Sequence, residues 1–246
     1  RASWEKHRPG DGCGGFIGSH LASFLADKAK VYGTVYDFDG LRNVEELKNK
    51  ITLMKCDISN KKDVERIVKK TVPDVVFHLA AQSFVVPSWK DPEKTFQTNF
   101  FGTYYLLEAL RKTSPGAKIL VACSSAEYGF ITKDDIPLAE TSPLRPSSPY
   151  AVSKVGQDML SYLYAKAYGM KVIRLRLFNT TGPKKTFDAC SDFARGIVEI
   201  EKGKKNSLTV GNLDGLRDIT DVRDTVRAMY LISQKGQDGD VYNICT

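Results

Sequence analysis

Short apolar runs alternate with longer helical stretches from residue 31 to about residue 180. In the longer stretches, such as Thr98–Thr113 and Tyr150–Tyr168, apolar residues recur three or four positions apart, as on the buried face of a helix. This alternation is typical of strand–helix units around a parallel sheet. We expect strands at Val31–Tyr36, Ile51–Cys56, Val75–Leu79, Ile119–Cys123, Val172–Phe178, Ser207–Val210 and Val241–Cys245.

The alternation loosens after Phe178, where residues 179–185 and 211–218 are polar and rich in turn-forming residues. These stretches predict substrate-binding loops beyond the sheet rather than another sheet layer. Residues 138–149, rich in Ser and Pro, predict a loop that ends where the helix at Tyr150 begins. We expect one NAD(P)-binding domain over residues 1–246, with substrate-lobe segments at about 179–220.

A glycine-rich segment, Gly12-Cys13-Gly14-Gly15-Phe16-Ile17-Gly18, precedes an amphipathic helix expected from Ser19 to about Lys28. Glycines let the backbone approach a pyrophosphate, and the N-terminus of the following helix favours its negative charge. The pattern therefore predicts a dinucleotide site on a Rossmann-type, doubly wound parallel sheet. Its expected contacts are Gly12, Gly15, Phe16, Ile17 and Gly18.

The choice between NAD and NADP depends on the residues after the next strand. Asp37 and Asp39 lie just past that strand, where a carboxylate could accept a hydrogen bond from the adenosine ribose. Asp37 favours NAD, whereas Arg42 could instead bind the 2′-phosphate of NADP. Both cofactors stay open.

The first ten residues do not suit the strand that should precede a phosphate loop. They read RASWEKHRPG, with several charges and a proline. Either neighbouring elements rescue a poor strand, or the natural chain begins differently. We favour the second, because a central parallel strand is covered on both faces and should be apolar.

Composition and charge argue against several other classes of protein. The 246 residues are 42% hydrophobic and 26% charged, as in an ordinary globular protein. No apolar run approaches the roughly 18 residues of a membrane span, and no signal peptide is evident, so we expect a cytoplasmic protein without a membrane partner. The net charge is +7, but Lys and Arg are interleaved with Asp and Glu, so we expect no nucleic-acid partner.

Cysteine and histidine spacing predicts no metal site. The five cysteines are widely scattered, and the three histidines form no metal-ligand pattern. We expect the cysteines to be reduced and mostly buried. His78, inside the apolar stretch Val75–Leu79, is expected to be a core histidine with a satisfied hydrogen bond.

Tyr150 and Lys154 lie four apart, so on a helix they share one face. A phenol has a pKa of about 10 in water, and a neighbouring ammonium lowers that pKa because it favours the phenolate. Ser124 could hydrogen-bond the same substrate oxygen. We therefore expect Ser124, Tyr150 and Lys154 to form a catalytic acid–base group. A Tyr and a Lys four apart are also common on exposed helices, so this assignment depends on the surrounding motifs.

Further motifs accompany this pair in a fixed order. They are Asp57-Ile58, His78-Leu79-Ala80-Ala81-Gln82, Asn99, Ser124-Ser125-x-x-Tyr128-Gly129, and Arg217-Asp218 followed by Asp221-Val222. With the glycine loop they resemble the extended short-chain dehydrogenase/reductase family, in particular its nucleotide-sugar epimerases, dehydratases and ketoreductases. The resemblance runs from Gly12 to the last residue. It implies a small C-terminal substrate-binding lobe, and because family members usually continue past the position of Thr246, we expect only part of that lobe in these 246 residues.

The resemblance also implies roles for individual residues. Lys154 would hold the nicotinamide ribose as well as assisting Tyr150, and Asn99 would support the cofactor site, unless it merely caps the following helix. Arg217 would grip the diphosphate of a sugar nucleotide, unless it only pairs with Asp218 or Asp221. The implied cofactor contacts are Asp57, Ile58, Leu79, Ala80, Ala81, Asn99, Tyr150 and Lys154. The implied substrate contacts are Gln82, Ser83, Ser125, Asn179 and Arg217.

Within the family, the stretches around Ala81–Val85 and Leu177–Asn179 are most similar to GDP-mannose 4,6-dehydratases and GDP-4-keto-6-deoxymannose reductases. Dehydratases place an additional Glu where this chain has Ala126, and Glu127 would point to the opposite face if the segment were a strand. The resemblance therefore favours reduction of a GDP-4-keto-6-deoxy sugar by NAD or NADP. Ala126 and residues 179–181 also depart from the reductases.

Three alternatives stay open. One is a GDP-mannose 4,6-dehydratase, another is a nucleotide-sugar 4-epimerase, and the third is a non-catalytic module that senses a dinucleotide. Intact Tyr150 and Lys154 argue against the third. The helices Thr98–Thr113 and Tyr150–Tyr168 also resemble the pair through which this family forms homodimers, so we expect a homodimer.

Overall fold

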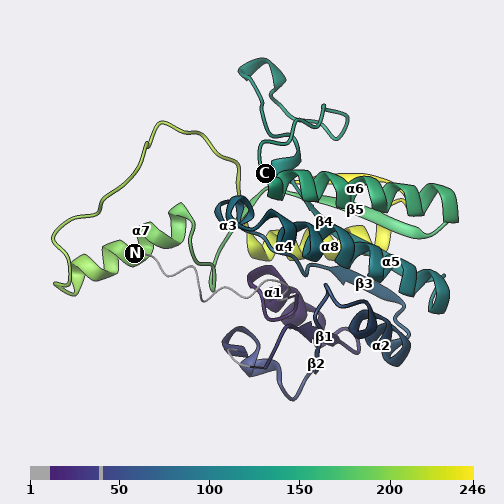
Figure 1. Ribbon diagram of the computed structural model, residues 1–246. Helices are drawn as coiled ribbons and strands as arrows, with labels where there is room; N and C mark the ends of the chain where they lie inside the picture. Colours follow the sequence, from purple (N-terminus) through teal and green to yellow (C-terminus); the bar gives the residue numbers. More distant parts are fainter. Residues whose placement is uncertain (1–11, 39–40) are drawn as a thin grey trace.

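Every strand pair in the described part of the chain is parallel. A computed structural model of the protein describes residues 12–38 and 41–246 (Figure 1). One sheet pairs β1 (Tyr32–Val35) with β2 (Thr52–Lys55). The second has the order β3 (Val75–His78), β4 (Lys118–Ser124), β5 (Lys171–Leu177) and β8 (Val241–Ile244).

These six strands confirm six of the seven expected ones to within one or two residues. The expected strand Ser207–Val210 is wrong, because these residues lie in an irregular and largely exposed segment. A short run of this kind becomes a strand only when a neighbouring strand pairs with it. Here the Leu208 side chain instead packs against Gly196, where an added Cβ would lie 2.3 Å from the leucine Cδ1.

Helices cover both faces of the sheets, as a doubly wound fold requires. On one face, α1 (Phe16–Leu25) and α8 (Val222–Lys235) pack over a core that includes Leu120 and Leu175. On the other face, α2 (Lys61–Thr71), α5 (Gly102–Thr113) and α6 (Pro149–Tyr168) cover a core that includes Leu107 and Val121. The expected Rossmann-type α/β fold is confirmed.

Gly12 lies at the junction of the two sheets. An added Cβ at Gly12 would lie 3.3 Å from Thr34 Oγ1 in β1 and 3.5 Å from the Cβ of Ala80, just after β3. Among the described residues no strand pairs with both β1 and β3. Residues 1–10, whose polar sequence does not suit a strand before the glycine loop, lie outside the described residues. Both explanations offered for that sequence therefore stay open.

The polar stretches after β5 build a part that stands away from the sheets. There β6 (Asn179–Thr181) pairs with β7 (Ile219–Asp221), and α7 (Ala189–Glu201) projects from the body with a long connection behind it (Figure 1). The remaining elements are the short helices α3 (Val85–Lys90) and α4 (Pro92–Phe96), the π-helical turn η4 (Gln97–Phe101), and the 3₁₀ turns η2 (Leu41–Asn43), η3 (Glu45–Leu47), η5 (Ser125–Glu127) and η6 (Lys133–Asp135).

Among residues 12–38 and 41–246, no helix is both long enough and apolar enough to cross a membrane. The five cysteines are all free, as expected, with three of them buried and Cys190 and Cys245 exposed.

Candidate active site

The glycine loop brings the N-terminus of α1 against β1. The Cys13 N–H donates to the Thr34 carbonyl at 2.9 Å, and α1 begins at Phe16, directly after Gly15. An added Cβ at Gly18 would lie only 1.7 Å from the Gly12 carbonyl oxygen, so only glycine allows this close packing. The first turn of α1 holds no acidic residue. Its free N–H groups and glycine backbone therefore fit a pyrophosphate.

A cavity of about 300 Å³ lies at the carboxyl end of β2. Asp57 lines it and accepts hydrogen bonds from the Ser59 N–H at 2.9 Å and the Ser59 hydroxyl at 2.6 Å. Ile58 is buried against Gly102. One of the cofactor contacts that the family resemblance implies, Asp57, therefore lines a cavity. Its lining residues are Tyr36, Asp57, Ser59, Asp91, Glu93, Lys94, Gln97 and Thr98.

The residues expected to discriminate between NAD and NADP flank the end of β1. Asp37 is partly buried two residues past β1, and Arg42 is exposed in η2. Asp39, the second carboxylate considered, lies outside the described residues.

Ser124, Tyr150 and Lys154 come together where β4 ends and α6 begins. Ser124 is the last residue of β4, and the Ser148 hydroxyl caps α6 by accepting the Ala151 N–H at 3.1 Å. The Ser124 side chain is near enough to Tyr150 to lower the pKa of the phenol, against the effect of burial. Lys154 is buried and donates from Nζ to the Ala122 carbonyl at 2.7 Å and to Gln157 Oε1 at 2.9 Å.

The expected lowering of the Tyr150 pKa is wrong for this arrangement. Burial raises the pKa of Tyr150 to about 12, although the nearby Ser124 side chain opposes the rise. Burial likewise lowers the pKa of Lys154. The ammonium of Lys154 donates to a backbone carbonyl and an amide oxygen rather than to the phenol, so loss of water outweighs charge attraction. Tyr150 is thus held as a neutral phenol, which is the form of a proton donor.

His78 is a core histidine, as expected. Its Nε2 lies 2.9 Å from the Thr103 hydroxyl, and burial together with Lys154 lowers its pKa to about 3. The imidazole therefore stays neutral.

Asn99 joins the loop after β3 to α6. Its Oδ1 accepts the Gln82 N–H at 2.8 Å, and its Nδ2 donates to the Gln82 carbonyl at 3.0 Å and to Ser153 Oγ at 2.9 Å. It lies inside the π-helical turn η4 rather than at a helix start, so the simpler expectation that it caps a helix is wrong. π-Helical turns often occur at functional sites. Asn99 fixes the position of Ala81 and Gln82 relative to Lys154 on α6.

Gln82, an implied substrate contact, uses its side chain for hydrogen bonds within the protein. Its Nε2 donates to the Phe84 carbonyl and to Thr95 Oγ1, both at 3.0 Å, and its Oε1 accepts the Phe84 N–H at 2.6 Å. Both donor positions are therefore used within the protein. In this arrangement Gln82 shapes the turn after β3, and the neighbouring Ser83 is the exposed side chain.

The other expected substrate residues lie on two elements. Ser125 follows Ser124 directly in η5 and is partly buried. Asn179 and Arg217 are brought together by the β6–β7 pair, because Asn179 Nδ2 donates to the Asp218 carbonyl at 3.1 Å. Within the described part of the chain, Arg217 forms no ion pair with Asp218 or Asp221, and its Nη1 donates to the Leu216 carbonyl at 2.7 Å. Its guanidinium is exposed.

Residues 182–188 lie against the start of α1, beside the glycine loop. The sequence did not predict this contact. The ammonium of Lys185 lies 5.0 Å from the centroid of the Phe16 ring, and the Pro183 carbonyl lies 2.8 Å from His20 Nε2. Lys184 donates to the Asn43 carbonyl at 2.7 Å and to Glu46. Two consecutive lysines after Gly-Pro were the available signal, but only the fold brings them to the phosphate loop.

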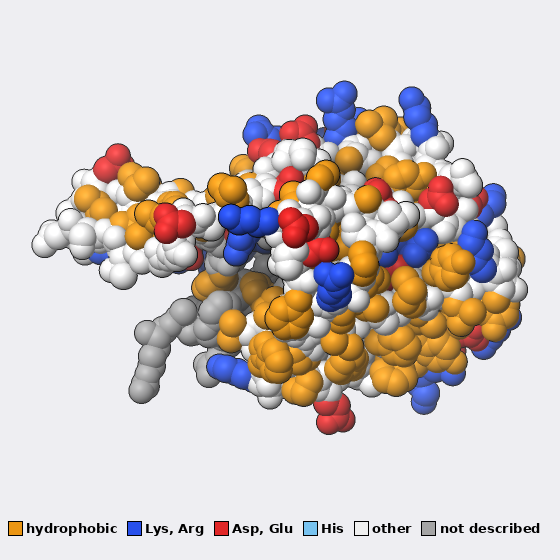
Figure 2. Space-filling model, turned by 90° about the horizontal axis from the view of Figure 1, so that it is seen from above, with side chains coloured by type: hydrophobic (Ala, Val, Ile, Leu, Met, Phe, Trp, Pro, Cys, Tyr) orange, Lys and Arg blue, Asp and Glu red, His pale blue; other side chains and the backbone are white. Residues whose placement is uncertain are grey.

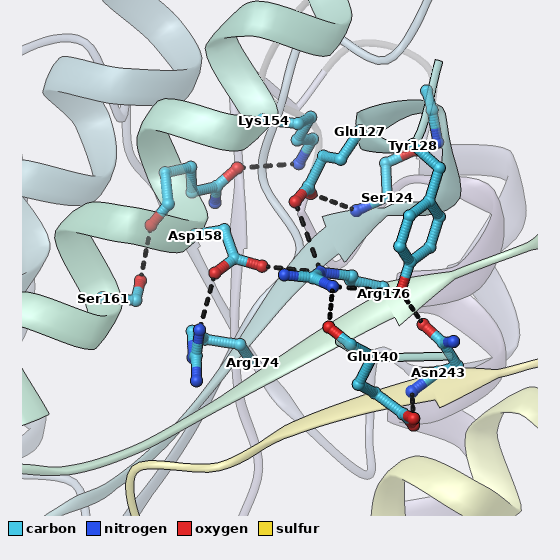
Figure 3. A network of polar contacts seen from close by, with 12 residues as sticks. Ser124, Glu127, Tyr128, Glu140, Lys154, Asp158, Ser161, Arg174, Arg176 and Asn243 are labelled. Carbon is cyan, nitrogen blue, oxygen red and sulfur yellow. Dashed lines mark hydrogen bonds and ion pairs between the residues drawn. The ribbon is translucent and has the colours of Figure 1, made fainter. Parts of the chain in front are cut away.

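A buried polar network that the sequence did not predict lies beneath Ser124 and Lys154 (Figure 3). Arg174 and Arg176 of β5 donate to the two carboxylate oxygens of Asp158 of α6, at 2.8 and 2.9 Å. Glu127 of η5 approaches Arg176 from the side of Ser124 (Figure 3). Alternating apolar and basic residues in β5 signalled the network, but its partners come from distant elements.

Comparison with known proteins indicates the same family as the sequence motifs. A family profile described as GDP-mannose 4,6 dehydratase matches residues 11–246. The chain is 31% identical over 237 residues to GDP-6-deoxy-D-mannose reductase of Pseudomonas aeruginosa, covering 96% of this chain and 73% of that protein. It is also 31% identical over 249 residues to GDP-mannose 4,6-dehydratase of Vibrio cholerae serotype O1, covering 93% of this chain and 64% of that protein, just under two thirds of its length.

Solved structures are similar in fold over nearly the whole chain. RMD from Pseudomonas aeruginosa, solved with NADPH, matches with a TM-score of 0.81 at 30% identity, covering 95% of this chain and 75% of that one. UDP-glucose 4-epimerase from Thermotoga maritima, solved with UDP-glucose, matches with a TM-score of 0.84 at 32% identity, covering 96% and 75%. UDP-glucose 4-epimerase from Thermus thermophilus, at a TM-score of 0.83 and 31% identity, was solved with NAD.

These matches extend over the glycine loop, the serine motif and the Tyr150–Lys154 pair, which the fold brings to one end of the parallel sheets. The chain belongs to the GDP-mannose 4,6-dehydratase family, within the nucleotide-sugar epimerase, dehydratase and reductase group of the extended short-chain dehydrogenases/reductases.

Proposed function

We propose that this protein is a cytoplasmic enzyme that modifies a nucleotide-linked hexose at C4 with NAD or NADP. The reaction we favour is reduction of a GDP-4-keto-6-deoxy sugar. The sugar nucleotide would lie between the catalytic residues and the β6–β7 pair, with Arg217 on its diphosphate and Ser83, Ser125 and Asn179 near the sugar.

The observation that carries the reductase proposal is the position of Glu127. Dehydration needs an acid–base carboxyl in addition to the tyrosine. Ala126 supplies none, and Glu127 is turned into the protein, where its Oε1 accepts the Ser124 N–H at 2.8 Å and its Oε2 faces Arg176. Ser125–Glu127 was considered as part of a strand, on which Glu127 would point to the opposite face from residue 126, but it forms a 3₁₀ turn. The carboxyl of Glu127 points away from the substrate side because of this turn.

The chain's own residues suit the reduction of a carbonyl. The bound nicotinamide would supply the hydride. Tyr150, held as a neutral phenol, would donate a proton to the C4 oxygen, and the Ser124 hydroxyl would hydrogen-bond and polarise that carbonyl. The buried ammonium of Lys154 would stabilise the phenolate that this proton transfer leaves behind.

Dehydration and 4-epimerisation are the alternatives within the same chemistry. The family profile and the Vibrio cholerae relative carry the dehydratase name, and the Thermotoga maritima structure is an epimerase. Both reactions begin by oxidising C4, for which a phenolate must accept a proton.

The test is to incubate the purified protein with GDP-mannose, UDP-sugars and GDP-4-keto-6-deoxymannose, with and without NADH or NADPH, and to identify products by mass spectrometry. Gain of two hydrogens on the 4-keto sugar, with the reduced cofactor consumed, is the expected result. Loss of one water from GDP-mannose without net use of reduced cofactor would instead make the protein a dehydratase.

Tyr150→Phe separates an enzyme from a dinucleotide sensor. We expect turnover to be lost while the Kd for the cofactor changes by less than about twofold, because the substitution removes only the transferable proton. Retained turnover would contradict the assignment of Tyr150 as the acid. A parent protein that binds cofactor but converts no sugar nucleotide would support the sensing module.

A further inference from the structure

The carboxyl of Glu127 is fully buried, with 0% of the residue exposed, yet it lies next to the candidate active site. Its Oε1 accepts the Ser124 N–H at 2.8 Å, and Ser124 Oγ accepts the Ala126 N–H at 3.1 Å. The two contacts form a capping box that closes η5 directly after β4. They fix both the backbone and the hydroxyl of Ser124.

The other carboxyl oxygen connects this turn to the buried network. Glu127 Oε2 lies 3.5 Å from Arg176 Nε and has no hydrogen bond among the described residues. Arg176 donates from Nε to Asp158 of α6 at 2.9 Å, and from Nη1 to the Tyr128 hydroxyl at 3.0 Å (Figure 3). The same Nη1 donates to the Glu140 carbonyl at 2.9 Å. Arg176 is thus already hydrogen-bonded to Asp158, Tyr128 and Glu140, and the one hydrogen bond that holds the Glu127 carboxyl is the one from the Ser124 N–H, among the described residues.

Stability alone does not explain a carboxyl at this position. Burying an ionised carboxylate costs several kcal/mol, and replacing a buried ion pair by apolar residues of similar volume is often neutral. Burial and the neighbouring Asp158 raise the pKa of Glu127 to about 8, against the opposing effects of Ser124 and Arg176. A leucine would fill the same volume at a lower desolvation cost. Only an acceptor such as a carboxyl or amide oxygen can hold the Ser124 N–H.

A metal is not the better explanation. The candidate ligand atoms of Cys123, Glu127 and Asp158 lie within 4.8 Å of one another. However, the guanidinium groups of Arg174 and Arg176 already contact the carboxylates, and they would repel a cation.

We propose that Glu127 is a positioning residue, which acts on the reaction through Ser124 by fixing the backbone turn that aims the serine hydroxyl at the substrate carbonyl. This inference rests on the proposed function, because it requires Ser124 to touch the reacting oxygen. Arg176 lies beside Glu127 and is paired with Asp158, so it connects the serine turn to α6, which carries Tyr150 and Lys154.

A double-mutant cycle tests the proposal. The variants are Ser124→Ala, Glu127→Leu and their combination, with Glu127→Gln as the conservative variant. For each we would measure kcat and KM on the converted substrate, the cofactor Kd by fluorescence titration, and the melting temperature. Glu127→Leu and Glu127→Gln have nearly the same volume, so they differ mainly in whether an acceptor faces the Ser124 N–H.

We expect Ser124→Ala to lower kcat about 10²-fold, as for loss of one donor to a developing oxyanion. Glu127→Leu should lower kcat at least about 10-fold with the cofactor Kd unchanged, and Glu127→Gln should restore most of the loss. In the Ser124→Ala background, Glu127→Leu should have no further effect, because the group through which it acts is gone.

Two outcomes would overturn the proposal. One is an additive loss in the double variant, which would mean that Glu127 acts independently of Ser124. The other is equal kcat for the Leu and Gln variants. If Ser124→Ala leaves kcat unchanged, the proposed function fails, because Ser124 would not act on the reacting oxygen. Failure of the proposed function is thus distinguished from failure of the proposed role of Glu127. If Glu127→Leu does not fold, Glu127→Met takes its place, because the flexible Met side chain fits the same space.

Glu108→Ala is the matched control. Glu108 is also a largely buried carboxylate that accepts from an arginine and a tyrosine, but it lies on α5 away from the serine turn. It should lower the melting temperature without lowering kcat.

Discussion

Lys185 places a cation at the phosphate loop from a segment 169 residues later in the chain than Phe16. Its ammonium is half-buried, and burial lowers its pKa while Asp188 opposes that change. Within the described residues it has no hydrogen bond or ion pair. A diphosphate bound at the start of α1 would supply a counter-charge.

We expect Lys185→Ala to raise the Kd for NAD and NADP about 10-fold, the effect of losing one charge-assisted contact. Binding of adenosine, which carries no phosphate, should not change. The matched control is Lys28→Ala, because Lys28 lies 4.7 Å from the ring of Phe24 at the other end of α1. Isothermal titration calorimetry measures all three ligands. Equal effects of the two substitutions, or an equal loss for adenosine, would contradict a phosphate contact.

At the scale of elements, the seating of α1 on the glycine loop depends on Gly18. An added Cβ there meets the Gly12 carbonyl oxygen at 1.7 Å, so Gly18→Ala must push α1 and the loop apart. We expect cofactor binding to be lost in fluorescence titrations. The control is Gly116→Ala, where a Cβ would meet nothing within 4 Å. An unchanged cofactor Kd in Gly18→Ala would contradict this, because α1 could then shift without loss of cofactor binding.

The α5–α6 pair is held by Glu108, whose side chain accepts from Arg111 Nε at 2.9 Å and from the Tyr164 hydroxyl at 2.8 Å. These contacts lower the pKa of Glu108 from 4.5 to about 2, with Arg111 the largest cause. Because the folded-state pKa is depressed, the stabilisation is present above pH about 4.5 and is lost as the pH falls towards 2.

Glu108→Gln should therefore lower the free energy of unfolding by about 1–2 kcal/mol at pH 7. The difference from the parent protein should shrink as the pH falls from about 5 to about 2. Urea unfolding at several pH values measures this. A difference that stays constant with pH would mean that the carboxylate charge is not the cause.

At the scale of the whole molecule, hydrophobic side chains gather on the body away from α7 (Figure 2). On the adjacent helices α5 and α6, Tyr104, Met159 and Leu163 are 37%, 42% and 52% exposed. Exposed apolar patches of this kind mark interfaces, and a two-fold dimer would pair the same face of each copy. We therefore propose that α5 and α6 form the homodimer interface.

We expect the parent protein to sediment as a dimer and Leu163→Glu as a monomer, because the interface would bury an unpaired carboxylate. The control is Leu231→Glu on α8, where Leu231 is 43% exposed on the other side of the sheets. Analytical ultracentrifugation distinguishes these states. A monomeric parent protein, or dimers for both variants, would contradict this interface.

The sequence determined the elements whose information is local. Six strands followed from apolar runs, and a helix directly after the glycine loop followed from glycine spacing, because these signals depend on residues a few positions apart. The bounds of that helix were wrong by three residues, since α1 spans Phe16–Leu25 and was expected from Ser19 to about Lys28. The same reasoning failed at residues 207–210, where a strand-like run has no partner to complete its hydrogen bonds. Motif order was sufficient to indicate the family, since it does not depend on packing.

Only the tertiary structure decided the electrostatics and the contacts between distant segments. The sequence predicted that Lys154 would lower the Tyr150 pKa, but burial of both groups reversed the direction. Its local signals at Lys184–Lys185 and in β5 did not say that Lys185 would lie against Phe16, or that Glu127 would bind the Ser124 N–H while facing Arg176. Spacing along a helix determines which side chains share a face, whereas their pKa values depend on how much water the rest of the fold removes.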